Sequence, residues 1–123
     1  MIDSLKEHII DAAQEVHRHL LGPGLLETVY ESALVYELSL RGISSQRQLP
    51  IPVTYKNSPI REPLFLDILV EDTIIVEIKA TGKDYPFYYA QLLTHLRLFN
   101  KKSGLLINFG KKNLKEGIFF LEN

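Results

Sequence analysis

The stretch Leu66–Ala80, which reads LDILVEDTIIVEIKA, constrains the fold of this chain more than any other. Two apolar, largely β-branched runs flank the polar tip Glu71-Asp72-Thr73, a pattern that predicts a β-hairpin. Three charged residues interrupt these runs, namely Asp67, Glu77 and Lys79. Because burying a charge costs on the order of several kcal/mol per ion, charged residues inside a sheet need partners. We expect these three to compensate one another or to bind a cation.

The length of the turn decides whether the two acids can meet. Side chains alternate between the two faces of a strand, so Glu77 and Lys79 share one face. A three-residue turn at 71–73 places Asp67 directly opposite Glu77, with Cβ atoms roughly 5 Å apart. A two-residue turn moves Asp67 to the other face. We expect the three-residue turn and a cation between the acids; the alternative is an amphipathic hairpin with ordinary salt bridges on a wet face.

Composition narrows the class of protein. The chain has 123 residues, 46% of them hydrophobic, which suits one domain spanning 1–123. It has no cysteine, so disulfides and thiolate metal sites are excluded. The absence of a signal-peptide pattern and of a long apolar run predicts a cytoplasmic protein with no membrane segment. A net charge of −1 argues against a strongly basic nucleic-acid binder, although lysines concentrate near the C-terminus.

Apolar periodicity and turn residues predict the remaining elements. The expected helices span 4–20, 25–40 and 86–99, and the expected strands outside the hairpin span 46–55, 104–109 and 117–121. Pro50 and Pro52 make 46–55 an edge strand. The glycine-bounded run 104–109 reads as a central strand parallel to one neighbour, in which Asn108 needs a hydrogen-bond partner. The order is ααβββαββ, an α/β fold.

The helices carry several residues whose roles the pattern leaves open. Ser4 and Glu7 fit a capping box, and His8 and His17 are expected on the surface. In the second helix we expect a core stripe made of Leu26, Val29 and Ala33 with Leu34 or Leu38, while Tyr30 and Glu31 share an adjoining face. Taken alone, Glu27 is an acid favoured by the helix dipole, and Gln91 and His95 are a polar helix flank.

Four motifs in order carry a resemblance to a known family. Gly24 to Tyr30, GLLETVY, fits G-x-x-E-x-x-Y; Asp67 precedes Glu77-Ile78-Lys79; and the segments AQLL at 90–93 and GLLINFG at 104–110 follow. Together they resemble the GxxExxY family of small bacterial proteins, placed in the PD-(D/E)XK nuclease superfamily. The resemblance implies a restriction-endonuclease-like core, αβββαβ, with a mixed central sheet flanked by helices.

The resemblance also implies a function and a set of site residues. It implies a Mg²⁺- or Mn²⁺-dependent nuclease acting on DNA or RNA, in which Asp67, Glu77 and the Ile78 carbonyl bind the metal and Glu27 binds through water or a second ion. Lys79 is then expected to orient or deprotonate the attacking water, and Gln91 to hold that water or a phosphate oxygen. Related nucleases commonly have tyrosine where this chain has His95, so a phosphate contact there is in doubt. The alternative is a catalytically inactive nuclease-fold protein that binds nucleic acid or a protein partner.

Overall fold

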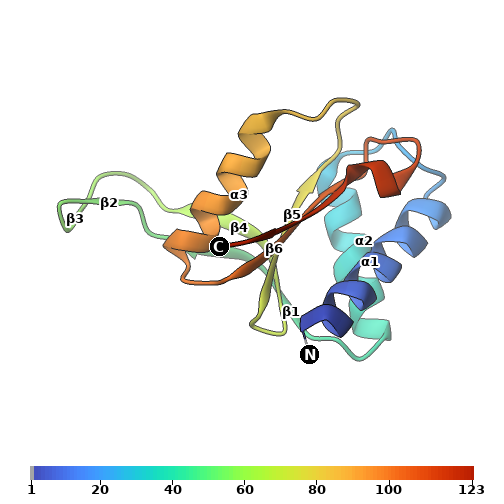
Figure 1. The fold of residues 1–123 in the computed structure, drawn as a ribbon, viewed down its shortest axis with the longest axis horizontal. Helices are drawn as coiled ribbons and strands as arrows, with labels where there is room; N and C mark the ends of the chain where they lie inside the picture. The colour runs from blue at the N-terminus through green and yellow to red at the C-terminus, as the bar shows by residue number, and fades with distance from the viewer. Residues whose placement is uncertain (1) are drawn as a thin grey trace.

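The computed structural model describes residues 2–123, which form helices on both faces of a mixed sheet (Figure 1). Within that range the helices are α1 (Ile2–His19), α2 (Glu27–Leu40), α3 (Pro86–Leu98) and the short 3₁₀ helix η1 (Leu114–Gly117). The strands of the main sheet are β1 (Ser45–Ile51), β4 (Leu64–Val70), β5 (Ile74–Lys79), β6 (Ser103–Asn108) and β7 (Ile118–Glu122). The predicted α/β class and the order ααβββαββ are confirmed, with one small hairpin added between β1 and β4.

The sheet has the order β1-β4-β5-β6-β7. Neighbouring strands are antiparallel except β5 and β6, which are parallel and connected through α3. β1 lies at an edge, as its prolines predict, and β6 is buried along its whole length. Asn108, at the end of β6, accepts hydrogen bonds from the main-chain amides of Thr81 and Gly110, which supply the hydrogen-bond partner expected from the sequence.

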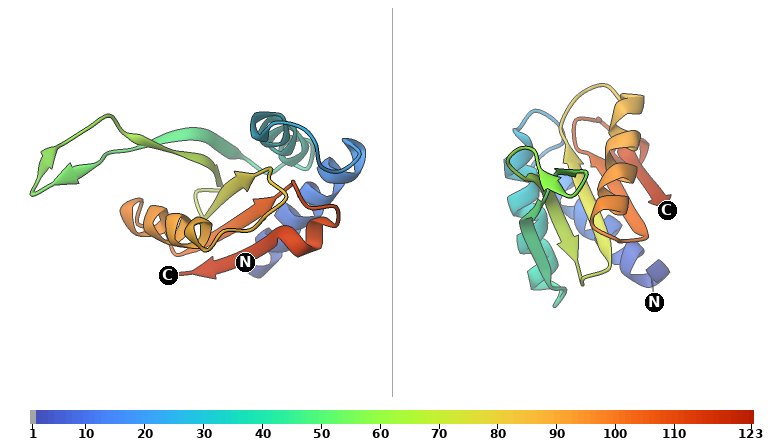
Figure 2. Two further views of the ribbon diagram at one scale, coloured as in Figure 1. Left: turned by 90° about the horizontal axis from the view of Figure 1, so that it is seen from above. Right: turned by 90° about the vertical axis from the view of Figure 1, so that its left-hand side faces the viewer.

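Two apolar layers sandwich the sheet. One face packs against α1 and α2 through residues such as Val76, Ile78 and Ile107. The opposite face packs against α3 through residues such as Ile75 and Leu106. Figure 1 and the right panel of Figure 2 show α3 on one side of the sheet and the α1–α2 pair on the other. Each strand therefore separates two cores, and the alternation of β5 assigns Glu77 and Lys79, which follow Ile75 at two-residue steps, to the α3 side.

The central hairpin has the predicted three-residue turn. Val70 pairs with Ile74, and Ile68 pairs with Val76, which is the register expected from the sequence. The turn closes with a hydrogen bond from the Thr73 amide to the Val70 carbonyl at 2.9 Å. The ladder ends at Ile68 and Val76, one residue before the predicted pair of Asp67 with Glu77, so the register is confirmed up to that point and the pair itself is not formed within the ladder.

The edge strand is shorter than predicted. β1 ends at Ile51, and the chain then extends into an arm that carries β2 (Thr54–Tyr55) and β3 (Ser58–Pro59). The arm projects beyond the sheet and turns back at Lys56 and Asn57, both with positive φ (Figure 2, left). Pro52 breaks the run because it has no amide to donate to a ladder.

The helices differ from the prediction in three details. α1 already includes residue 2, so Ser4 lies inside the helix and cannot cap it. His17, which was expected on the surface, is buried, and its Nε2 lies 2.8 Å from the Lys111 carbonyl. Of the core residues predicted for the second helix, Leu26, which precedes α2, and Val29 are exposed, and the buried stripe of α2 is Tyr30, Glu31, Leu34 and Leu38.

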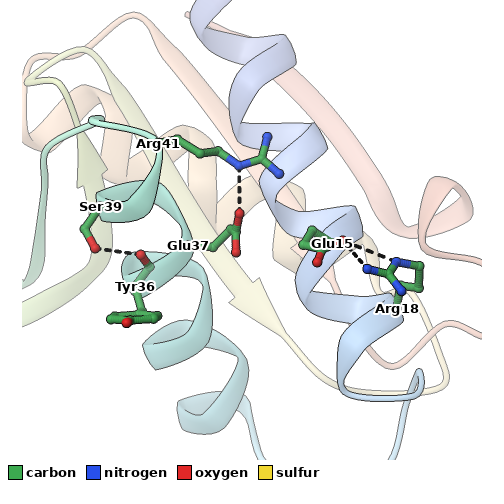
Figure 3. Close-up of polar contacts among 6 residues, drawn as sticks. All are labelled: Glu15, Arg18, Tyr36, Glu37, Ser39 and Arg41. Carbon is green, nitrogen blue, oxygen red and sulfur yellow. Dashed lines mark hydrogen bonds and ion pairs between the residues drawn. The ribbon is translucent and has the colours of Figure 1, made fainter.

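The outer surface of the α1–α2 pair carries ordinary ion pairs. Arg18 pairs with Glu15 at 2.6 Å, and Arg41 pairs with Glu37 at 2.9 Å (Figure 3). Such exposed pairs contribute only about 0–1 kcal/mol each. Within residues 2–123, no helix combines the length and apolar character needed to cross a membrane. The cytoplasmic location stays a prediction.

Candidate active site

Asp67 lies where the central hairpin opens. The pairing of β4 with β5 ends at Ile68 and Val76; beyond that point β4 continues along β1 to Leu64, and β5 continues along β6. Into this opening Asp67 directs its Oδ2, which accepts a hydrogen bond of 2.8 Å from the Ile78 amide. The side chain thus replaces the carbonyl that a continued ladder would have offered to that amide.

The environment of Asp67 disfavours its charge. Burial is the largest cause and the Glu77 carboxylate is the next, and together they raise the pKa of Asp67 from 3.8 to about 7. The hydrogen bond from the Ile78 amide acts in the opposite direction, while Glu31 and Glu27 add smaller repulsions. Asp67 and Glu77 are therefore close enough for their charges to interact.

Glu77 is buried under α3 and held by a residue whose role the sequence left open. Its Oε1 lies 2.5 Å from Nδ1 of His95, and the two side chains are only 5% and 7% exposed. The sequence pattern by itself predicts that His95 lies on a polar flank of the helix. The signal that could have found this contact is the spacing of Gln91 and His95, which puts both on the face of α3 that meets β5.

Lys79 and Gln91 are in direct contact. Lys79 Nζ donates a hydrogen bond of 3.2 Å to Gln91 Oε1. The same ammonium group lies 4.6 Å from the centre of the Tyr88 ring, one turn earlier in α3. Lys79 is only partly buried, so it lies at the margin of the buried layer.

Glu27 approaches the group from the other face of the sheet. It is the first residue of α2, is exposed, and shares a shallow hollow with Ala80, the residue after Lys79. The loop before it is fixed by Tyr30, whose hydroxyl donates to the Gly22 carbonyl at 2.7 Å. Tyr30 itself is fully buried and stacks on Phe109 with ring centres 4.6 Å apart. In the G-x-x-E-x-x-Y motif, Glu27 is therefore exposed to solvent, whereas Tyr30 is buried and anchors the loop.

A second buried acid, Glu31, lies close to Asp67. It accepts hydrogen bonds from Arg47 at 2.9 and 3.1 Å and from the Gln48 side chain at 2.9 Å. Gln48 has a positive φ and stands in β1 beside the opening at Asp67, between the ladder pairs of Arg47 and Leu49. The cluster fixes β1 against α2 at the level of the opening. Sequence reasoning missed it, since its members come from separate elements.

A scan against protein-family models matches residues 3–119 to the model described as the PD-(D/E)XK nuclease superfamily. The chain belongs to this superfamily. No curated protein and no solved structure matches the chain. The five-stranded mixed sheet and three helices of residues 2–123 agree with the restriction-endonuclease-like fold of PD-(D/E)XK proteins.

PD-(D/E)XK nucleases generally use divalent metal ions, so the fit of this site to such an ion matters. Within the described residues, no three histidine or acidic side chains converge closely enough to form a metal-binding group by themselves. The donors do have the right chemistry: Asp67 and Glu77 are hard oxygen ligands that repel each other, and each has one oxygen engaged by a protein donor. A cation held by the two carboxylates would relieve that repulsion. The residues therefore fit a site completed by water, substrate or main chain.

Proposed function

We propose that this PD-(D/E)XK protein is a Mg²⁺- or Mn²⁺-dependent nuclease that hydrolyses phosphodiester bonds in nucleic acid. We also propose that it belongs to the GxxExxY family, on the basis of Gly24, Glu27 and Tyr30. The observation that carries the proposal is the arrangement on β5: Glu77 beside Asp67, and Lys79 two residues further on the same face, in contact with Gln91.

Asp67 and Glu77 would bind the metal directly, each through the oxygen that no protein donor engages. The Ile78 carbonyl would supply a third ligand, and Glu27 would act through water or a second ion. When bound, a divalent cation lowers the pKa of an attacking water and offsets charge on the phosphate. Hard oxygen donors suit Mg²⁺ or Mn²⁺, which retain several waters.

Lys79 and Gln91 would act on the attacking water and the phosphate. The Lys79 ammonium orients the water or, once deprotonated, accepts its proton. In the structure Gln91 uses its Oε1 to accept from Lys79, which leaves the two N–H donors of its amide for a phosphate oxygen. Gln91 therefore holds the lysine on one side and the substrate on the other.

The loops beyond the parallel strands offer a surface for nucleic acid. Lys83 follows β5, and Lys111 and Lys112 follow β6, so these cations gather near the carboxyl ends of two adjacent parallel strands. The two loops are joined, because Lys111 pairs with Asp84 at 3.0 Å. Because Asp84 offsets the charge of Lys111, Lys83 and Lys112 are the lysines that we propose for phosphate contacts by a chain whose net charge is −1.

The test compares Lys79→Ala and Lys79→Arg with wild type on single- and double-stranded DNA and RNA, with Mg²⁺ or Mn²⁺. Both variants should lower turnover by about 10²-fold or more, because an arginine keeps the charge but is bulkier, planar and not readily deprotonated. Substrate binding should change little. Lys102→Ala, which removes an exposed lysine, is the control and should cleave normally.

The alternative hypothesis is that this nuclease-fold protein binds nucleic acid or a protein partner and cleaves no nucleic acid. If the wild-type protein cleaves no nucleic acid with either metal, yet binds it as well as Lys79→Arg does, we would reject the nuclease hypothesis in favour of this binding function.

A further inference from the structure

We propose that His95 is a positioning residue that presents Glu77 to the metal through a single oxygen, an inference that rests on the proposed function. A carboxylate that binds a metal ion is ionised and only accepts hydrogen bonds, so in the metal-binding state the hydrogen of the His95–Glu77 contact lies on Nδ1. The imidazole then occupies Oε1 and leaves Oε2 for a cation. Metal-binding side chains are commonly fixed by such partners, whose loss lowers metal affinity or activity by about 10–100-fold.

The dimensions of helix and strand explain why α3 can serve both residues of the E-x-K motif. Glu77 and Lys79 are two residues apart in β5, which separates them by about 6.7 Å along the strand. Gln91 and His95 are four residues apart in α3, which separates them by about 6 Å along the helix. Because His95 contacts Glu77 while Gln91 contacts Lys79, α3 runs opposite to β5 with its side chains in step.

The packing leaves His95 little freedom to do anything else. Its neighbours along the helix, Leu92 and Leu96, are fully buried in the layer between α3 and the sheet. Glu77 is equally buried, and His95 gives it the only hydrogen bond that it receives from a described side chain. Without the imidazole, the Glu77 carboxylate could rotate and offer both of its oxygens to the ion. A histidine at this position thus fixes both the orientation of Glu77 and the number of oxygens it offers.

The experiment measures Mn²⁺ affinity directly, by the electron paramagnetic resonance signal of free Mn²⁺ titrated with the full-length protein. His95→Asn keeps an amide nitrogen at the same number of bonds from the backbone as Nδ1, whereas His95→Leu removes the donor at similar size. We expect His95→Asn to bind Mn²⁺ within about threefold of wild type and His95→Leu to bind about 10–100-fold more weakly. In cleavage assays His95→Leu should lose turnover with an unchanged KM for nucleic acid.

The control is Thr94→Ala, an exposed position on the same helix that should change neither readout. If His95→Leu does not fold, His95→Gln takes its place, because its amide nitrogen lies one bond too far to match Nδ1. A merely structural role would lower the melting temperature of the variants and leave Mn²⁺ affinity unchanged, and that result would overturn the proposal.

The outcomes also separate this inference from the proposed function. A wild type that binds no Mn²⁺ overturns both. Equal Mn²⁺ affinity in wild type and His95→Leu, or in wild type and His95→Gln where that variant takes its place, overturns the role of His95 alone. Weakened Mn²⁺ binding in that variant, combined with a wild type that cleaves no nucleic acid, supports the role of His95 and rejects the nuclease.

Discussion

Asp67→Asn should stabilise the metal-free protein, and the effect should depend on pH. Burial and the Glu77 carboxylate raise the pKa of Asp67 from 3.8 to about 7, so the folded protein binds a proton there that the unfolded chain releases at lower pH. Between about pH 4 and pH 7 the unfolded state therefore holds fewer protons than the native state, and the free energy of unfolding falls as pH rises. Above about pH 7 the full cost of the ionised carboxylate is present.

The size of this cost follows from the pKa. At about 1.4 kcal/mol for each pH unit, the difference between 3.8 and about 7 corresponds to roughly 4 kcal/mol as an upper bound. Relaxation and water near a half-buried carboxylate reduce it, so we expect about 1–3 kcal/mol. Asparagine retains an oxygen that can accept from the Ile78 amide, so the substitution removes the charge and keeps the hydrogen bond.

The assay is urea denaturation of wild type and Asp67→Asn in EDTA between pH 4 and pH 8.5. The variant should exceed wild type by about 1–3 kcal/mol at pH 8 and match it near pH 4. Asp11→Asn, which removes an exposed acid on α1, should follow wild type at every pH. A variant that is no more stable than wild type at pH 8 would refute the reasoning.

Adding Mn²⁺ extends the same experiment to the proposed metal site. Binding to the folded state alone raises stability by mass action, by about 2.7 kcal/mol at a hundredfold excess over Kd. Mn²⁺ should therefore raise the melting temperature of wild type at pH 8 and leave Asp67→Asn nearly unchanged. An equal rise in both proteins would place the bound ion elsewhere.

Three further substitutions test the supports around the site by their free energies of unfolding. Tyr30→Phe removes a hydroxyl with two main-chain partners and should cost about 1–2 kcal/mol; no loss would show that water replaces those bonds. Glu31→Ala should cost about 1–3 kcal/mol, less than for a fully buried pair because Arg47 is 40% exposed and can be hydrated. Gly110→Ala would put a Cβ 2.3 Å from the Thr81 main chain and should cost more than about 3 kcal/mol, so a variant of normal stability would contradict that close packing.

The register of the central hairpin was predictable because it depends on local features. The two apolar runs and the polar tip predict the hairpin, and side chains alternate between the faces of each strand. The register then depends only on whether the turn has an odd or an even number of residues. Val70 opposite Ile74 confirms the odd turn. The edge position of β1 and the buried, parallel β6 were predictable in the same way, from prolines in one and a continuous apolar run in the other.

The buried face of α2 was not predictable from spacing alone. The helix is apolar on more than one side, so Leu26 and Val29 compete with Tyr30 and Leu34 for the core. Contact with Phe109, almost 80 positions further along the chain, decides in favour of Tyr30. His95 and Glu31 escaped prediction for a related reason: a polar side chain can be buried when a partner from another element satisfies it, and no local pattern records that partner.

The contacts around the motif determine which residue can separate an enzyme from a binder. Asp67 accepts a hydrogen bond from the Ile78 amide at the opening of the sheet, and Glu77 is bonded to His95, so both acids also take part in structural contacts. Replacing either acid would therefore change structural contacts together with any chemistry. Lys79 differs, because its partners are a glutamine side chain and the face of a tyrosine ring, and neither depends on the lysine to satisfy a buried charge. Its replacement should cost little stability, so a large loss of turnover in a normally folded Lys79→Arg protein would report chemistry rather than structure.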